Sequence, residues 1–326
     1  MLQYVLRRLI YSIPILIIAS VVVFLVAHAT ADPLAAIRRA GPQISKADVL
    51  RAKKELGLDK SQAEQYWIWL THFLRGDWGH SLLSARPVFG DLRTALANSL
   101  LLGLFATTIS LFIGTTVGIY SAVKQYSAFD HVSTGAAFFG ISIPNFWFAL
   151  LLQLAFGVYL VQWFHLSQPW LYTAGMSQPG VSGFSLADRL RHIGLPAIVL
   201  AVQIIAVYSR YMRSSMLEVL HSDYMRTARA KGLTERRVLV HHGARNALIP
   251  LTTQLAIDIG TLAGGLIVTE SIFQWPGMGP LFLSSFNSGD YPMVLAWTMI
   301  VVTFVIVFNL MADILYAVLD PRIRYA

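Results

Sequence analysis

The sequence has no cysteine and few charged residues. Only 13% of its 326 residues are Asp, Glu, Lys or Arg, whereas about a quarter are charged in an ordinary soluble domain. The lack of cysteine excludes a disulfide framework and a thiolate metal site. No G-x-x-x-x-G-K-[ST], H-E-x-x-H or G-x-S-x-G motif occurs, and each is the pattern of a standard catalytic or nucleotide-binding site. We therefore predict no catalytic residue and no metal site.

Long uncharged apolar runs take the place of these features. Hydrophobic residues make up 56% of the chain, and several runs are long enough to cross a bilayer as helix. The pattern predicts an all-α polytopic membrane protein with six transmembrane helices, and Pro144 is expected to kink the third. The predicted spans are 9–31, 98–122, 132–160, 192–213, 246–270 and 292–316.

The basic residues indicate the orientation. Although the net charge is +8, Lys and Arg lie between the apolar runs, where they set topology and do not indicate nucleic acid. Arg7, Arg8 and Lys124 fall on one side, together with eight basic residues from Arg210 to Arg245. The segment 32–97 carries ten basic residues on the other side, which is tolerated because long loops translocate largely regardless of charge. Both termini are therefore predicted to be cytoplasmic.

The predicted organisation has three parts. Residues 1–31 form the cytoplasmic N-terminal end and first span. Residues 32–97 form an extracytoplasmic helical subdomain, with helices at Ser45–Gly57 and Gln62–Leu74, that either packs on the membrane surface or seats a soluble partner. Residues 98–326 form a five-helix core with a cytoplasmic loop at 214–246. The second outer helix is expected to gather its apolar side chains on one broad face: Tyr66, Trp67, Trp69, Leu70 and Phe73.

Few polar groups lie inside the spans. We assign Gln254, Asp258 and Glu270 to a candidate translocation path, because ionisable groups in a membrane face protein or water. A structural bond to a neighbouring helix is the alternative for Asp258, and a structural role is favoured for Asp313. Two glycine pairs are spaced for close helix approach, and the second could face another membrane subunit. These pairs are Gly114–Gly118 and Gly260–Gly264.

The inner loop carries the more specific pattern. Asp223 is expected to cap a short helix, Tyr224–Lys231, which Gly232 ends. Ala228 and Ala230 leave little bulk, so the helix could enter a partner's groove, and Arg226 and Arg229 would share a face. Anionic lipid headgroups are the alternative contact. The candidate residues are Asp223, Tyr224, Arg226, Thr227, Ala228, Arg229, Ala230, Lys231, Gly232 and Leu233.

Motifs spread along the chain resemble those of the permeases of ATP-binding-cassette importers. RTARAKGL at 226–233 and NALIP at 246–250 resemble the EAA signature, with Arg226 and Thr227 in place of its leading glutamate and first alanine. The similarity extends to MLQYVLRRLI, RGDWGHSL at 75–82, ISIPNF at 141–146, TESIFQWPGMG at 269–279 and LDPRIRY at 319–325. The nearest pattern is the dipeptide, oligopeptide, glutathione and nickel branch, and the long outer segment resembles the first of its two paired permeases.

This resemblance implies the type I importer fold in a bacterial inner membrane and transport of short peptides. The alternatives are nickel or glutathione as cargo, or a stand-alone ion-coupled carrier; a membrane enzyme is disfavoured. The expected partners are a second permease, two ATPase subunits that bind ATP and Mg, an external binding protein and the bilayer. The helix at 224–232 would be the coupling helix, and the chain itself would hold no cofactor. Without a basic residue, the segment 273–292 is either an ordinary outer loop or one that dips into a cavity, and its turn would face the binding protein: Trp275, Pro276, Gly277, Met278 and Gly279.

Overall fold

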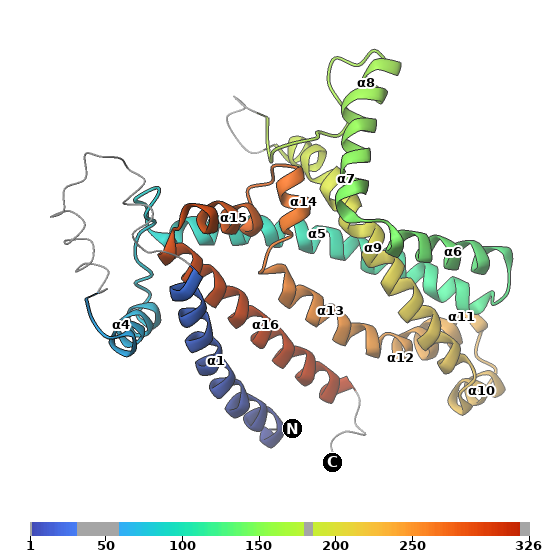
Figure 1. Ribbon diagram of the computed structural model, residues 1–326. Coiled ribbons are helices and arrows are strands. Elements are labelled where there is room, and N and C mark those ends of the chain that lie inside the picture. The colour runs from blue at the N-terminus through green and yellow to red at the C-terminus, as the bar shows by residue number, and fades with distance from the viewer. Residues whose placement is uncertain (1, 31–58, 179–184, 320–326) are drawn as a thin grey trace.

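The computed structural model describes residues 2–30, 59–178 and 185–319, and helices make up nearly all of its regular structure (Figure 1). In these ranges five helices are long and apolar enough to cross a membrane. The prediction of an all-α polytopic membrane protein is therefore confirmed. The helices are α1 (Leu2–Thr30), α4 (Gln62–Leu74), α5 (Val88–Val123), α6 (Ala128–Ser142), α7 (Asn145–Leu154), η1 (Ala155–Tyr159), α8 (Leu160–Trp163), α9 (Leu186–Leu220), α10 (Asp223–Ala230), α11 (Glu235–Arg237), η2 (Val238–Ala244), α12 (Arg245–Ala247), α13 (Ile249–Leu262), α14 (Ile267–Ile272), α15 (Met278–Ser288) and α16 (Tyr291–Leu319).

Helix α5 begins at Val88, well before the predicted start at 98. Its first turns are held by protein packing, because Val88 and Leu92 are buried in one cluster with Met278 and Met293. The charged residues of this stretch suggested that the helix starts later, but the apolar contacts stabilise the helix from Val88 onward. Residues 88–97 thus belong to the helical core and not to a separate outer subdomain.

The predicted third span is broken, not merely kinked. Helix α6 ends at Ser142, and α7 starts after Pro144 in a new direction (Figure 1). Ile143 has φ −74° and ψ 124°, the extended conformation favoured before proline. Its carbonyl accepts a hydrogen bond from Gln203 Nε2 of α9 at 2.9 Å. This bond supplies a partner for a carbonyl group that the break leaves outside the helix.

The predicted fifth span, 246–270, is also interrupted. Helix α13 ends at Leu262 and α14 begins at Ile267. Gly265 lies between them with φ +76°, a left-handed conformation that glycine adopts without steric cost. A Cβ atom at Gly265 would lie 2.5 Å from the backbone nitrogen of Gly279. The prediction of an uninterrupted fifth helix is therefore wrong, since the backbone turns here to make room for the first residues of α15.

Both glycine pairs allow close helix packing. A Cβ atom at Gly118 would lie 2.6 Å from the carbonyl oxygen of Ser209, and one at Gly114 would lie 2.8 Å from Tyr208 Cβ, so α5 and α9 are in intimate contact. A Cβ atom at Gly260 would lie 2.8 Å from Phe308 Cβ. Gly260 therefore packs against α16 of its own chain, which corrects the suggestion that this face meets a second membrane subunit.

Helix α4 confirms the predicted helix at Gln62–Leu74. Ser61 and Glu64 form a reciprocal capping box at its start. Tyr66 and Trp69 pack around the buried Phe24 of α1, whereas Trp67 is 63% exposed and is not part of this cluster. The predicted single apolar face is thus divided. The other predicted outer helix, Ser45–Gly57, lies outside the described residues.

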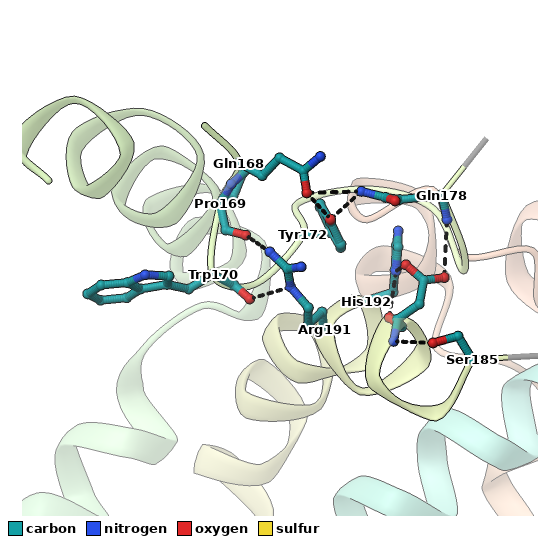
Figure 2. Close-up of polar contacts among 9 residues, drawn as sticks. Gln168, Pro169, Trp170, Tyr172, Gln178, Ser185, Arg191 and His192 are labelled. Atoms are coloured by element: carbon teal, nitrogen blue, oxygen red, sulfur yellow. Dashed lines mark hydrogen bonds and ion pairs between the residues drawn. The ribbon is translucent and has the colours of Figure 1, made fainter. Parts of the chain in front are cut away.

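Residues 168–178, which follow α8, are held against the first turns of α9 (Figure 2). Arg191 donates from Nε to the carbonyl oxygen of Trp170 at 3.0 Å and from Nη2 to that of Pro169 at 2.5 Å. Its guanidinium also lies 4.5 Å from the centroid of the Tyr172 ring. Asp188 accepts a hydrogen bond from the backbone N–H of Gln178 at 3.2 Å. Residues 168–178 are therefore fixed against the start of α9 by these contacts.

The chain reverses direction repeatedly, so the beginning of α1, the end of α16 and α10 lie toward one end of the bundle (Figure 1). Arg8 of α1 and Asp313 of α16 form an ion pair of 2.8 Å at this end. Helices α8 and α15 lie toward the other end (Figure 1). The structural role predicted for Asp313 is confirmed by this pairing.

Candidate functional site

Helix α10 is a short helix that follows directly from the end of α9. It spans Asp223–Ala230, and Ser222, not Asp223, occupies the position before its first turn. Ser222 Oγ donates to the carbonyl oxygen of Val219 at 2.6 Å. Gly232 ends the helix with φ +74°, which confirms the predicted glycine stop. The sequence therefore located the helix correctly and misplaced its cap by one residue.

The inner face of α10 is buried within the chain. Met225 and Ala228 of α10 form one cluster with Val238 of η2, and each is no more than 6% exposed. A Cβ atom at Gly243 would lie 3.3 Å from Met225 Cε and 2.8 Å from Met216 Cε of α9. Helix α10 is thus packed tightly against both α9 and η2. Displacing α10 must displace these two segments as well.

This packing corrects the role predicted for Ala228. Its small side chain makes room for Val238 and neighbouring apolar groups of the same chain, and not for a partner's groove. Ala230 is exposed, as are Thr227 and Lys231. The side of α10 that could meet another molecule also carries Tyr224, which is 44% exposed.

The two arginines of α10 have different surroundings. Arg229 donates from Nε and Nη2 to the carboxylate of Glu235 at 3.3 and 3.0 Å, and these bonds raise the pKa of the Arg229 guanidinium. Arg226 makes only a long contact of 3.7 Å to Asp223, with both side chains largely exposed. Arg229 therefore braces α10 against α11, so Arg226 is the arginine more open to a partner.

Gln254 and Asp258 of α13 belong to one hydrogen-bonded group. Asp258 Oδ2 accepts from the Tyr208 hydroxyl of α9 at 2.7 Å, and Oδ1 accepts from Gln254 Nε2 at 2.8 Å. Both carboxylate oxygens thus have partners, and one bond joins two helices. This is the structural alternative predicted for Asp258. A role in lining the translocation path stays a prediction.

Glu270 does not line a path in this structure. It is fully buried, and its carboxylate accepts hydrogen bonds from Ser99 Oγ at 2.5 Å and from the backbone N–H of Gly279 at 2.8 Å. A Cβ atom at Gly277 would lie 2.5 Å from this carboxylate. The prediction for Glu270 is wrong because its carboxylate anchors the start of α15 to α5.

The same anchoring overturns most of the predicted binding-protein surface. Trp275 is 1% exposed and Met278 is fully buried, and both Gly277 and Gly279 are buried as well. Trp275 Nε1 donates to the carbonyl oxygen of Asn98 at 3.0 Å. Of the five predicted residues only Pro276 is exposed. The segment does dip inward, as one sequence-based alternative held, but its conspicuous residues are internal contacts.

Several structural partners were not predicted from the sequence. Met225 holds α10 in place, Ser99 meets Glu270, and Tyr208 meets Asp258. Arg213 forms a two-pronged ion pair with Asp130 at 2.6 and 2.8 Å. Of these residues, only Met225 could have been inferred from the local sequence, since it lies three residues before Ala228 and therefore on the same helix face. The other contacts join residues far apart in the chain.

Comparisons with known proteins match the whole length of the chain. The model of the family described as "Binding-protein-dependent transport system inner membrane component" matches residues 114–325, and the model of the corresponding N-terminal region matches residues 1–112. The oligopeptide transport system permease protein AppB of Bacillus subtilis is 42% identical, with 100% of each chain covered. A putative peptide permease protein of Brucella suis is 39% identical over 99% of each chain.

A glutathione transport system permease protein, GsiC of Salmonella choleraesuis, is 38% identical with 100% of each chain covered. Matches of this extent leave no large segment of the chain outside the comparison. This chain belongs to the family of inner membrane components of binding-protein-dependent transport systems, the permeases of ATP-binding-cassette importers.

Proposed function

We propose that this permease, paired with a second one, carries short peptides through the membrane, and that α10 receives the movement of a separate ATPase subunit. ATP and Mg would be bound by that subunit and not by this chain. An external binding protein would deliver the cargo. The charge distribution supports placing both termini and α10 in the cytoplasm, where ATP is available.

The observation that carries this proposal is the two-sided character of α10. One side is locked into the chain by Met225 and Ala228. The other side exposes Tyr224, Arg226 and Thr227 beyond the end of α9. A helix that packs firmly against two segments of its own chain, and whose outer side is exposed, is suited to pass the movement of a bound subunit on to those segments.

The segments connected to α10 indicate which helices such a movement would reach. Directly before α10 comes α9, a continuous helix from Leu186 to Leu220. After α10 the chain runs through η2 and α12 into α13, whose Gly260 packs on α16. ATP can switch these helices only if its binding favours one arrangement of α10 over another. The proposed ATPase contact would supply that preference.

The peptide cargo is supported by the names of relatives, which include an oligopeptide permease and a putative peptide permease. Glutathione is the second candidate because another relative is named as its permease, and it is itself a small peptide. Vesicles should contain this chain, the second permease, both ATPases and the binding protein. Uptake of a labelled peptide that requires ATP and is reduced by unlabelled peptide would support the proposal, whereas displacement only by glutathione would favour the alternative.

A stand-alone carrier makes the opposite prediction. Vesicles that contain this chain alone, without ATP or another subunit, would then accumulate the labelled peptide under an ion gradient. We expect no uptake in these vesicles. Uptake by the chain alone would refute the role of α10 as well as the dependence on a partner.

The α10 contact can be tested by charge reversal. Arg226→Glu should weaken recovery of the ATPase with the purified permease by about tenfold, the effect of losing one hydrogen bond to a charged group. Lys124→Glu is the matched control, since Lys124 is an exposed basic residue that follows α5 at the same end of the bundle. Equal recovery of the ATPase with both variants would indicate that α10 contacts lipid headgroups and not the ATPase.

A further inference from the structure

A groove of about 650 Å³ lies between α6 and α9, away from the α10 contact. One face of each helix lines it, since the contributing residues recur at helical spacing of three or four. Helix α6 contributes Thr134, Phe138 and Ile141, and α9 contributes Val207, Arg210, Tyr211, Ser214 and Leu217, with Arg213 beside them. The groove therefore combines a mostly apolar wall with two guanidinium groups and three hydroxyl groups.

One of the two guanidinium groups is already neutralised. Arg213 is bound on two sides by the Asp130 carboxylate, and the same carboxylate accepts a hydrogen bond from Ser121 of α5. This ion pair joins α5, α6 and α9 at one edge of the groove. Its charges cancel, so it gives the groove little net attraction for an anion.

Arg210 is different. Its guanidinium lies 4.7 Å from the centroid of the Phe138 ring, which holds it across the groove. No ion pair joins Arg210 to an acidic side chain within the described ranges. Its donors and its charge are thus available to a ligand. Tyr211 and Ser214 place hydroxyl groups on the same side of α9.

The position of Arg210 along α9 matches the edge of a bilayer. Arg191 and Arg210 lie on one continuous helix, and no Asp, Glu, Lys or Arg occurs between them. At 1.5 Å per residue, the uncharged stretch from His192 to Ser209 is roughly 27 Å long. The hydrocarbon core of a bilayer is about 30 Å thick. With Arg191 at one boundary, Arg210 therefore lies at the level of the headgroups on the α10 side.

The groove is polar toward this boundary and apolar away from it. Helices α6 and α9 are antiparallel, because Asp130 meets Arg213 near one end while Ile143 meets Gln203 near the other. Thr134, Arg210 and Ser214 therefore lie nearer the α10 side. Phe138, Ile141 and Val207 lie deeper in the membrane. The groove thus changes from polar to apolar in the same direction as a phospholipid in that leaflet does, from headgroup to acyl chain.

We propose that the groove binds an anionic phospholipid, with its phosphate at Arg210 and an acyl chain along Phe138, Ile141 and Val207. The apolar surroundings favour an intact lipid over a transported peptide, since Val132 and Phe139 on the same helix are 71% and 68% exposed. Arg210 provides the charge complementarity, and anionic lipids are attracted to basic residues at this depth. The proposal does not depend on the identity of the transported cargo.

The test uses the intact importer, purified with all its subunits and titrated with short-chain phosphatidylglycerol or phosphatidylcholine while native mass spectrometry measures bound lipid. We expect phosphatidylglycerol to bind in preference to phosphatidylcholine. Arg210→Ala should weaken phosphatidylglycerol binding about fivefold, which corresponds to one basic residue at a charged lipid surface. Lys124→Ala, which removes an exposed basic residue at the same end, should leave this binding unchanged.

Two further variants guard against a folding defect. Arg210→Lys keeps the charge and should retain most of the binding. Ile141→Trp fills the apolar part of the groove and should reduce lipid binding with Arg210 intact; Ile141 is already 40% exposed, so this change does not overfill a core. Unchanged phosphatidylglycerol binding in Arg210→Ala would overturn the proposal. Equal binding of glycerol phosphate would assign the site to a free anion, and displacement of the lipid by short peptides would assign it to the cargo; either result overturns the lipid site.

Discussion

Met225 provides the sharpest test of how α10 is held. Its side chain is fully buried among Ala228, Val238 and the end of α9. We predict that Met225→Ala loosens α10 and reduces peptide-stimulated ATP hydrolysis, while the importer stays assembled in the membrane. The reason is that a helix of eight residues has little stability of its own. Its order therefore depends on this one apolar cluster.

The size of the effect follows from the burial. Replacing a fully buried methionine by alanine removes about 2–5 kcal/mol of packing free energy. If this loss acts on the local opening of α10, the opened fraction rises roughly 30-fold or more. Amide hydrogen exchange across 224–230 should accelerate by the same factor. Exchange in α5 and α16 should change little, because their packing does not involve Met225.

Met293→Ala is the matched control for this experiment. Met293 is 1% exposed and packs in the cluster that contains Val88 and Met278, at the start of α16. The same atoms are removed at the other end of the molecule. We expect this variant to lose overall stability and to keep both the protection of α10 and the stimulation of ATP hydrolysis by peptide. Full protection of α10 in Met225→Ala, with normal stimulation, would refute the reasoning.

Three other predictions concern contacts that the structure revealed. Ser99→Ala removes a hydrogen bond to the buried Glu270 carboxylate and should destabilise the permease by about 1–3 kcal/mol, measured as the free energy of unfolding in detergent; no loss would contradict an anchoring role. A double-mutant cycle of Arg8→Ala and Asp313→Asn should give a coupling of up to about 1 kcal/mol, since both side chains are partly exposed; purely additive effects would show that the pair does not join α1 to α16. Gly232→Val forces a branched residue into a left-handed conformation at a cost of about 1–2 kcal/mol and should lower peptide uptake more than Gly232→Asn; equal uptake would show that the conformation at Gly232 is unimportant.

Much of the fold could be predicted because apolar runs and helix-ending residues are local signals. The short helix before Gly232 was visible in the sequence, and Pro144 marked the position of the break, although only a kink was predicted there. The interruption after α13 was not recognised, although Gly264 and Gly265 are adjacent. A glycine pair in an apolar run permits both helix packing and a turn. The choice is made here by the backbone of Gly279, which is distant in sequence.

The candidate site was predicted less completely, because exposure cannot be read from residue type alone. Ala228 and Ala230 are the same residue two positions apart, and one is buried while the other is exposed. Trp275 and Gly277 looked like an outer contact surface, but they pack around Glu270 and Asn98. The Glu270 carboxylate, which was assigned to the candidate translocation path, instead organises this packing. Such contacts depend on helices whose relative positions the sequence does not encode locally.

The central claim is that the outer side of α10 meets the ATPase subunit. A photoreactive amino acid at Tyr224 tests it most directly when the reconstituted importer is illuminated during ATP-driven uptake. The same amino acid at Trp67, an aromatic residue on α4 that is 63% exposed, serves as the control. The account predicts covalent linkage of position 224, and not of position 67, to the ATPase. Linkage of position 224 to phospholipid alone, throughout turnover, would contradict it.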